Sequence, residues 1–201
     1  MIKAIIFDLW DTIGTKGFAI SKELRNHFKI KEYTDFLFDY ENSIQTNQWN
    51  SMEEMAKNFL YTFNLPINEN NIVYIIKVFN KGIKNAKLYL GIKKILGNLK
   101  NKYKVGLISN TTIFEISFID KFGIRKYFDA VVCSHDIGKL KPSKEIFNEI
   151  LLKLGVKPEE AIFIDDSEYN INKAVSYGLK GLHFRSASQI KKELELKGLI
   201  K

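Results

Sequence analysis

The chain has 201 residues, of which 45% are hydrophobic and 27% charged, and its formal net charge is +8 at pH 7; this is ordinary for a globular protein with a full core and room for an insertion. No apolar run reaches about 18 residues, which argues against a membrane partner, and a single cysteine, Cys133, precludes an intramolecular disulfide and predicts a reducing, cytoplasmic setting. The lysines are scattered and accompany no nucleic-acid motif, so we predict no nucleic-acid partner.

The chain begins with an apolar run at residues 3–7, which is typical of a strand and lacks the cleavage pattern of a signal peptide. Between residues 16 and 87 the pattern changes, because apolar side chains recur at helical spacing and strand signals are few. Residues 72–84 are one such predicted helix. We therefore predict a helical insertion over residues 15–87, and a core built from residues 1–14 and 88–201.

Short apolar runs alternate with helical stretches in the rest of the chain. With the first run they predict five strands, at residues 3–7, 105–108, 130–133, 161–164 and 181–184. The helices are predicted at residues 91–102, 113–122, 143–154, 168–177 and 188–197, and glycines follow several of them. Strands that alternate with helices predict an α/β fold, with a parallel sheet covered by helices on both faces.

Polar residues follow the predicted strands at once. Asp8 ends the first strand, Ser109 the second, and the pair Asp165 and Asp166 the fourth, while Lys141 lies in the loop and helix start after the third. Ligands of an open parallel sheet bind beyond the carboxyl ends of its strands. We therefore expect these side chains, which are far apart in the sequence, to converge on one site.

The first of these residues, Asp8, could attack phosphorus and form an acyl phosphate that water then cleaves, or it could bind a metal ion. A turn or helix-capping role is the plainer alternative for a single aspartate. Thr12 could donate a hydrogen bond to a phosphoryl oxygen, and a capping role is open for it as well.

The segment that starts at Ser109 and Asn110 precedes a predicted helix, so a hydroxyl and helix N-terminal amides could bind an anion or simply cap the helix. Lys141 could neutralise an attacking carboxylate and a phosphate, with Lys139 as a competitor for this role and Ser143 as the predicted cap of the next helix.

The adjacent carboxylates of Asp165 and Asp166 repel each other unless a cation or hydrogen-bond donors offset their charge. Magnesium prefers oxygen ligands and keeps several waters, so one or two carboxylates suffice to hold it. An exposed acidic turn is the alternative for this pair, and Asn170 is expected to be only a cap or helix residue.

Taken together, four segments resemble the motifs of the haloacid dehalogenase superfamily of hydrolases: Phe7-Asp8-Leu9-Trp10-Asp11-Thr12, Ile108-Ser109-Asn110-Thr111, Lys139-Leu140-Lys141-Pro142 and Phe163-Ile164-Asp165-Asp166. The resemblance implies a Rossmann-like core with a mobile helical cap. It also implies that Asp8 is the nucleophile, Ser109 the phosphate binder and Lys141 the charge-balancing lysine. Magnesium would lie among Asp8, the Trp10 backbone carbonyl and the Asp165–Asp166 pair, with Asp166 as the direct ligand and Asp165 bound through water.

The first motif departs from that family at Trp10, where its phosphatases carry a second aspartate that protonates the leaving oxygen and later activates water. Asp11, which stands where the family usually has glycine, could take over this role or only cap the turn. General acid–base help is worth about 10²–10⁴ in rate, so a slow or selective phosphatase is expected. A 2-haloacid dehalogenase needs no acid here and is the first alternative; a phosphate- and metal-binding protein without activity is the second.

The expected partner is a small anionic phosphorylated substrate, and both a monomer and a homodimer are consistent with the sequence. Three further residues carry open expectations. Lys16 could contact an anionic substrate, but a solvated loop lysine is the favoured expectation. Arg25 is the one cap arginine that could bind a substrate carboxylate, and His135 either packs against a loop or approaches the site.

Overall fold

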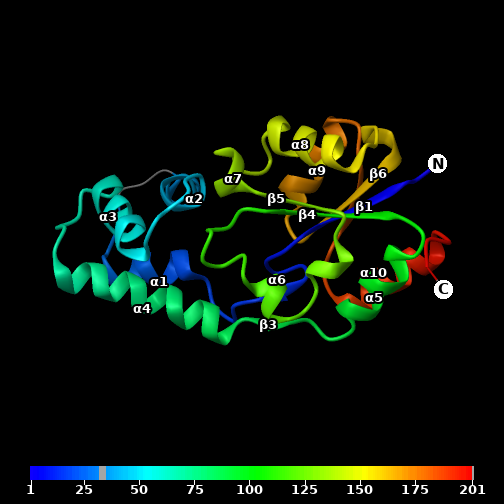
Figure 1. Ribbon diagram of the computed structural model, residues 1–201. Helices are drawn as coiled ribbons and strands as arrows, with labels where there is room; N and C mark the ends of the chain where they lie inside the picture. Colours follow the sequence, from blue (N-terminus) through cyan, green and yellow to red (C-terminus); the bar gives the residue numbers. More distant parts are fainter. Residues whose placement is uncertain (32–34, 201) are drawn as a thin grey trace.

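Five parallel strands form the centre of the protein (Figure 1). The computed structural model describes residues 1–31 and 35–200. The strands lie in the order β5-β4-β1-β6-β7, which is 3-2-1-4-5 when they are counted along the chain. Their bounds are β1 Ala4–Asp8, β4 Lys104–Ser109, β5 Ala130–Cys133, β6 Ala161–Asp165 and β7 Lys180–His183.

The central strand β1 is buried along its whole length, which explains its uninterrupted apolar run before Asp8. It pairs with β4 on one side and β6 on the other, so that Phe7 lies opposite Leu107 and Ile164. The chain builds one half of the sheet from β1 to β5 and then returns to build β6 and β7. The strand order therefore reverses between β1 and β6, and crevices at such a reversal are where open α/β sheets bind ligands.

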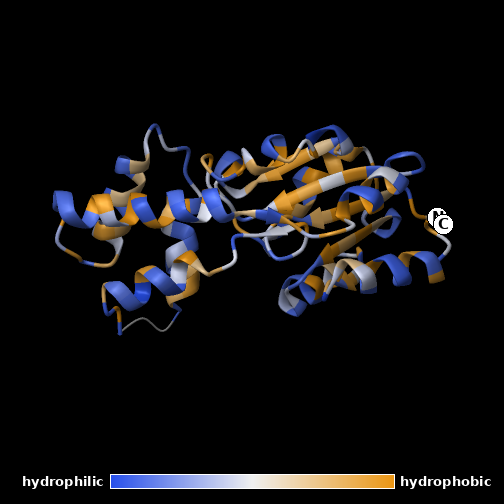
Figure 2. Ribbon diagram, turned by 90° about the horizontal axis from the view of Figure 1, so that it is seen from below, coloured by the Kyte–Doolittle hydropathy of each residue, from blue (hydrophilic) through white to orange (hydrophobic). Residues whose placement is uncertain are grey.

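Helices cover both faces of the sheet. Successive strand side chains point to opposite faces, and because those on both faces are apolar, both faces must be covered. Ile5 and Phe7 face the cluster that contains α5 (Ile92–Lys100) and α10 (Ala187–Leu196). Ala4 and Ile6 face the opposite cluster, which contains α8 (Lys144–Leu154) and α9 (Glu168–Ser176). Figure 2 shows the apolar strands between these helices, whose outer faces are polar.

A separate group of four helices extends from one end of the sheet (Figure 1). These are α1 Ile20–His27, α2 Phe36–Gln45, α3 Met52–Thr62 and α4 Glu69–Asn85, and they share a hydrophobic cluster of their own. A two-stranded antiparallel ribbon, β2 (Gly14–Thr15) with β3 (Lys87–Leu88), joins the helical lobe to the sheet lobe. Gly14 is required there, because a Cβ atom would lie 2.7 Å from the Lys87 carbonyl oxygen.

The predicted α/β fold is confirmed, and every predicted strand lies within one residue of its observed bounds. The helix predicted over residues 113–122 is wrong in extent: only α6 (Phe118–Lys121) is helical, and turns occupy the five residues before it. The remaining short elements are α7 (Ser134–Ile137) and the 3₁₀ turns η1 (Arg125–Tyr127) and η2 (Pro158–Glu160). No helix in the described part of the chain combines the length and apolarity that crossing a bilayer requires.

The sheet core predicts a simple stability test. Leu107 on β4 is fully buried, whereas Leu152 on α8 is 78% exposed. We expect Leu107→Ala to lower the free energy of unfolding by about 2–5 kcal/mol, because it removes apolar contacts and leaves a cavity. The matched change Leu152→Ala should stay within about 0.5 kcal/mol of the wild type in the same urea titration. Equal effects of the two substitutions would contradict the assigned packing.

Candidate active site

The candidate site is a cavity of about 800 Å³ beyond the carboxyl ends of β1 and β6, where the strand order reverses. Its walls come from both lobes, because α2 supplies one side and the loops that follow the strands supply the other. Asp8, Lys141, Asp165 and Asp166 line it together, which is the convergence that their positions after parallel strands predict.

A buried lysine lies between two of these carboxylates. The Lys141 ammonium donates to Asp8 Oδ1 and to Asp165 Oδ2, the latter at 2.7 Å, and all three side chains are less than a tenth exposed. Burial alone would lower the pKa of Lys141, but Asp165 and Asp8 outweigh that effect and raise it, so the lysine stays cationic.

The charges around Asp8 indicate that the site holds more carboxylates than one lysine can neutralise. Burial raises the pKa of Asp8, Lys141 opposes that shift, and the carboxylates of Asp165 and Asp166 add to it. Burial and Asp165 likewise raise the pKa of Asp166. Three carboxylates against one ammonium leave two excess negative charges when all are ionised, which fits the demand of a divalent oxygen-binding cation.

Asp165 is held by donors on both of its oxygens. The Ser167 amide donates to Oδ1 at 2.8 Å, and the Asn170 side-chain amide lies 3.2 Å from each oxygen. The prediction that Asn170 is a helix residue is confirmed, because it lies in the first turn of α9. Its side chain also donates to the strand end, which the prediction did not include. Asp166 is the more exposed member of the pair and lines the cavity directly.

Trp10 joins the two lobes at the position that departs from the family motif. Its indole N–H donates to Thr111 Oγ1 at 3.1 Å, and its ring centroid lies 5.0 Å from that of Phe118. The Lys16 ammonium lies 4.3 Å from the indole centroid. Lys16 also forms an ion pair with Glu115, which is 1% exposed. The expectation of a solvated Lys16 is thus wrong, because Glu115 and the indole hold it in a largely buried position.

Asp11 adopts a left-handed backbone conformation, with φ of 60°. Its amide donates to the Gly14 carbonyl at 2.6 Å and closes a tight turn, which explains why a residue tolerant of positive φ stands here. Its exposed side chain lines the edge of the cavity near Tyr89, whose pKa is raised first by burial and then by this carboxylate.

Asn110 connects the helical lobe to the buried lysine. Its Oδ1 accepts from the Lys141 amide at 2.7 Å, and its Nδ2 donates to Glu41 on α2 at 3.0 Å. Burial raises the pKa of Glu41, against the lowering effect of Asn110, Lys141 and Lys16. Sequence reasoning missed Glu41, since helical spacing shows which face of α2 is buried but not which residue reaches a loop of the other lobe.

The hydroxyls of Thr12 and Ser109 are fully buried, and neither has a hydrogen-bond partner among residues 1–31 and 35–200. Buried hydroxyls without partners are uncommon. Neither Thr12 nor Ser109 is among the residues that line the cavity of about 800 Å³. The capping interpretation of Ser109 is wrong, because turns rather than a helix follow β4. Ser143 occupies the N-cap position of α8, as predicted, but its side chain makes no cap hydrogen bond.

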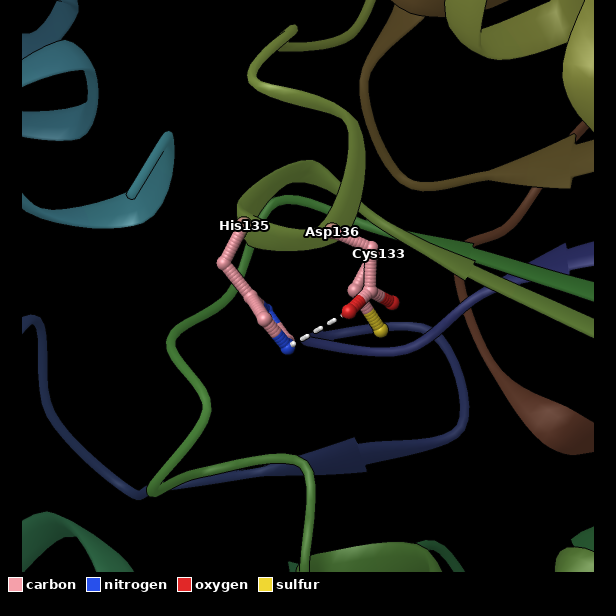
Figure 3. A group of neighbouring side chains, drawn as sticks. All are labelled: Cys133, His135 and Asp136. Carbon is pink, nitrogen blue, oxygen red and sulfur yellow. Dashed lines mark ion pairs between the residues drawn. The ribbon is translucent and has the colours of Figure 1, made fainter. Parts of the chain in front are cut away.

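Cys133, His135 and Asp136 form a second cluster of potential metal ligands at the end of β5 (Figure 3). His135 Nδ1 lies 2.9 Å from the Thr111 carbonyl oxygen, and its Nε2 lies 3.4 Å from Asp136. Burial raises the pKa of Cys133 to about 12, which disfavours the thiolate that a metal would need. His135 thus packs against the loop at Thr111, which is the first of its two predicted roles.

Arg25, the cap arginine considered for a substrate carboxylate, points elsewhere. Its side chain donates to the Ile30 carbonyl and packs on Phe36, and it lines neither described cavity.

Comparison with known proteins gives these features a family context. A family model described as "Haloacid dehalogenase-like hydrolase" matches residues 5–183. Flavin mononucleotide hydrolase 1 of Arabidopsis thaliana is 28% identical over 149 residues. The match covers 73% of this chain and 58% of that relative's length. Glyceraldehyde 3-phosphate phosphatase of Pyrococcus furiosus is 29% identical over 98% of this chain and 86% of its own.

Solved structures show the same fold at low identity. An HAD family enzyme from Bacteroides thetaiotaomicron superposes with a TM-score of 0.68 at 22% identity, over 92% of this chain and 94% of that one. It has also been solved in complex with magnesium and inorganic phosphate. A 2-haloacid dehalogenase from Pseudomonas syringae superposes with a TM-score of 0.65 at 17% identity, over 98% of this chain and 100% of that one. The fold alone therefore does not separate a phosphatase from a dehalogenase.

The buried pair beside Trp10 predicts a large stability effect. We expect Lys16→Met to lower the free energy of unfolding by about 3 kcal/mol, because it leaves the Glu115 carboxylate buried without its cation. The double variant with Glu115→Gln should recover part of that loss, since no buried charge remains. Lys57→Met removes a solvent-exposed ion pair with Glu53 and should cost less than about 1 kcal/mol in the same urea titration. Similar losses for Lys16→Met and Lys57→Met would contradict the argument.

Proposed function

We propose that this chain, which belongs to the haloacid dehalogenase-like hydrolases, is a magnesium-dependent phosphatase that acts on a small phosphomonoester through an aspartyl-phosphate intermediate. The observation that carries the proposal is the cluster of Asp8, Lys141, Asp165 and Asp166 at one cavity wall. Relatives that are named phosphatases or phosphate-ester hydrolases favour this activity over dehalogenation.

In the proposed reaction Asp8 attacks the phosphorus of the bound ester. A bond forms between its carboxylate oxygen and phosphorus, and the bond from phosphorus to the leaving oxygen breaks. That oxygen takes up a proton and departs as an alcohol. Water then attacks the aspartyl phosphate, loses a proton, and releases inorganic phosphate and free Asp8. Lys141 stabilises the negative charge of Asp8 and the phosphoryl oxygens throughout both steps.

Four groups would hold the metal: the carboxylates of Asp8 and Asp166, the Trp10 backbone carbonyl and, through water, Asp165. The hydrogen bonds that already occupy both Asp165 oxygens support its indirect role. When bound, magnesium would offset the excess negative charge and polarise the phosphoryl oxygens. The magnesium and phosphate complex of the structurally similar Bacteroides enzyme supports magnesium as the metal.

Thr12 and Ser109 are proposed to bind phosphoryl oxygens, which would satisfy their unpartnered hydroxyls. Asn110 is proposed to act at the edge of the substrate, where it also positions the Lys141 backbone. Residues 15–87 would serve as a cap that closes over residues 1–14 and 88–201, and Asn110 with Glu41 would form one contact of the closed state. The buried free thiol of Cys133 is consistent with a cytoplasmic setting.

The missing acid at Trp10 also suits a 2-haloacid dehalogenase, because a halide leaves without a proton. The three carboxylates argue against that alternative. Their excess charge calls for a metal ion, and of the two enzyme types only the phosphatase uses one. Asp11 remains the proposed source of acid–base help in the first motif, and its place at the cavity edge supports that role.

The nucleophile test uses phosphate release from an aryl phosphate, p-nitrophenyl phosphate, with magnesium or with a chelator. We expect Asp8→Asn to lose more than about 10³-fold in kcat, because an amide does not form the acyl phosphate. Chelation should abolish the wild-type rate. Asp120→Asn alters an exposed aspartate on α6 and should leave the rate unchanged. Metal-independent release of halide from a 2-haloacid, with no phosphate release, would establish the dehalogenase instead.

The proton-transfer test compares leaving groups in Asp11→Asn, which preserves tolerance of the left-handed turn. For an alkyl phosphate, whose leaving oxygen needs a proton, we expect kcat to fall by about 10²–10⁴. For p-nitrophenyl phosphate, whose phenolate leaves readily, the pre-steady-state burst of phenolate, which reports attack by Asp8 and not the later attack of water, should slow by less than about 3-fold. The same small change with both substrates would show that Asp11 only shapes the turn.

A further inference from the structure

The first turn of α2 presents apolar side chains to the main cavity as well as to the core of the helical lobe. Phe36, Tyr40 and Ile44 recur at helical spacing and are buried in the hydrophobic cluster of that lobe. Leu37 and Phe38 lie off this buried face, are each 54% exposed, and line the cavity that contains Asp8. The outward face of a surface helix is ordinarily polar, so exposed apolar side chains beside an active site indicate a ligand surface.

The sheet lobe contributes an exposed aromatic side chain to the same cavity. Tyr169 lies in the first turn of α9 and is 62% exposed. The ammonium of Lys173, one turn further along, lies 5.9 Å from its ring centroid. Both lobes therefore offer an aromatic ring to a molecule that is bound in the cavity, Phe38 from α2 and Tyr169 from α9.

The charges around these side chains disfavour a second anionic group. Asp35, which caps α2, and Glu41 and Asp11 all contribute carboxyl groups to the cavity. Lys141 is already bonded to two carboxylates, and Lys139 is the one other cation among the described residues that line the cavity. The part of a substrate that extends from the phosphoryl group toward α2 therefore meets more acidic than basic groups and binds best without negative charge.

The cavity has room for a ring as well as a phosphoryl group. Its volume of about 800 Å³ lies within the roughly 300–1,000 Å³ of pockets that enclose whole small-molecule ligands. A flat ring buries both of its faces when aromatic side chains stack on it, and such stacking requires no charge.

We propose that Leu37, Phe38 and Tyr169 bind a flat, uncharged aromatic ring in the leaving group of the substrate. The substrate is then a phosphomonoester of an alcohol that carries such a ring, as a nucleoside monophosphate does. The inference rests on the proposed phosphatase function and narrows its substrate class. It disfavours simple sugar phosphates, which leave the three apolar side chains without a partner, and phosphoglycolate, which brings a carboxylate toward the acidic groups.

The test compares kcat/KM within two pairs of esters that differ in the ring: AMP with ribose 5-phosphate, and riboflavin 5′-phosphate with ribitol 5-phosphate. All four lose phosphate from a primary alcohol, so the difference within a pair reports binding of the ring. We expect the wild type to prefer the ring-bearing member of at least one pair by about 10-fold or more.

Phe38→Ala and Tyr169→Ala should each reduce that preference by about 5-fold or more, because the ring loses a stacking partner. The rate with the ring-less member should stay within about 2-fold of the wild type, which also shows that the variants are folded. Phe38→Tyr retains a flat ring and should keep the preference. The control Tyr61→Ala alters a 74% exposed ring on α3 that lines neither cavity, and it should change nothing.

Three outcomes would overturn the inference while leaving the phosphatase intact. They are equal kcat/KM within both pairs, a ring preference that either alanine variant leaves unchanged, and phosphate release from p-nitrophenyl phosphate but from none of the four esters. Absence of phosphate release from all five compounds would instead refute the proposed function, and the inference with it.

Discussion

The hydrogen-bonded bridge from Lys141 to Asp8 and Asp165 is the interaction on which the site depends. One ammonium bonds to two buried carboxylates that come from neighbouring strands and compensates part of their charge; a lone buried charge of either sign would be strongly unfavourable. The bridge is possible because β1 and β6 are adjacent and parallel, so that both aspartates leave the sheet at the same edge. Asn110 then fixes the lysine by accepting from its backbone amide.

Trp10, the residue that departs from the family motif, has a structural role. Trp10 donates to Thr111, packs near Phe118 and lies beneath the ammonium of Lys16. Through the Lys16–Glu115 ion pair, the start of the helical lobe is tied to the loop after β4. Trp10 thus packs between the loop after β4 and Lys16 at the start of the helical lobe. In the proposed phosphatase, another group at the cavity would transfer the proton.

The helical lobe contributes more than a cover to this arrangement. The face of α2 that borders the cavities presents Glu41, which accepts from Asn110. The same helix therefore contacts the residue that accepts from the Lys141 amide, and it lines both cavities.

The pattern of apolar runs predicted where the polar site residues lie: Asp8, Ser109 and the Asp165–Asp166 pair follow predicted strands at once, Lys141 follows another within a loop, and parallel strands bring such ends together. The α/β fold followed from the same alternation of strands and helices. The polar contacts between the lobes, in contrast, are visible only in the folded structure. Glu41 and Asn110 are 69 residues apart, and Lys16 pairs with a carboxylate from a distant loop, so local periodicity contains no signal for either contact. The helix predicted over residues 113–122 begins only at Phe118. In the preceding turn Glu115 accepts from Thr112, a local contact, and pairs with Lys16 of the helical lobe, a distant one. Propensity describes neighbours along the chain, whereas these contacts arise from burial of charge between segments that meet only in the folded protein.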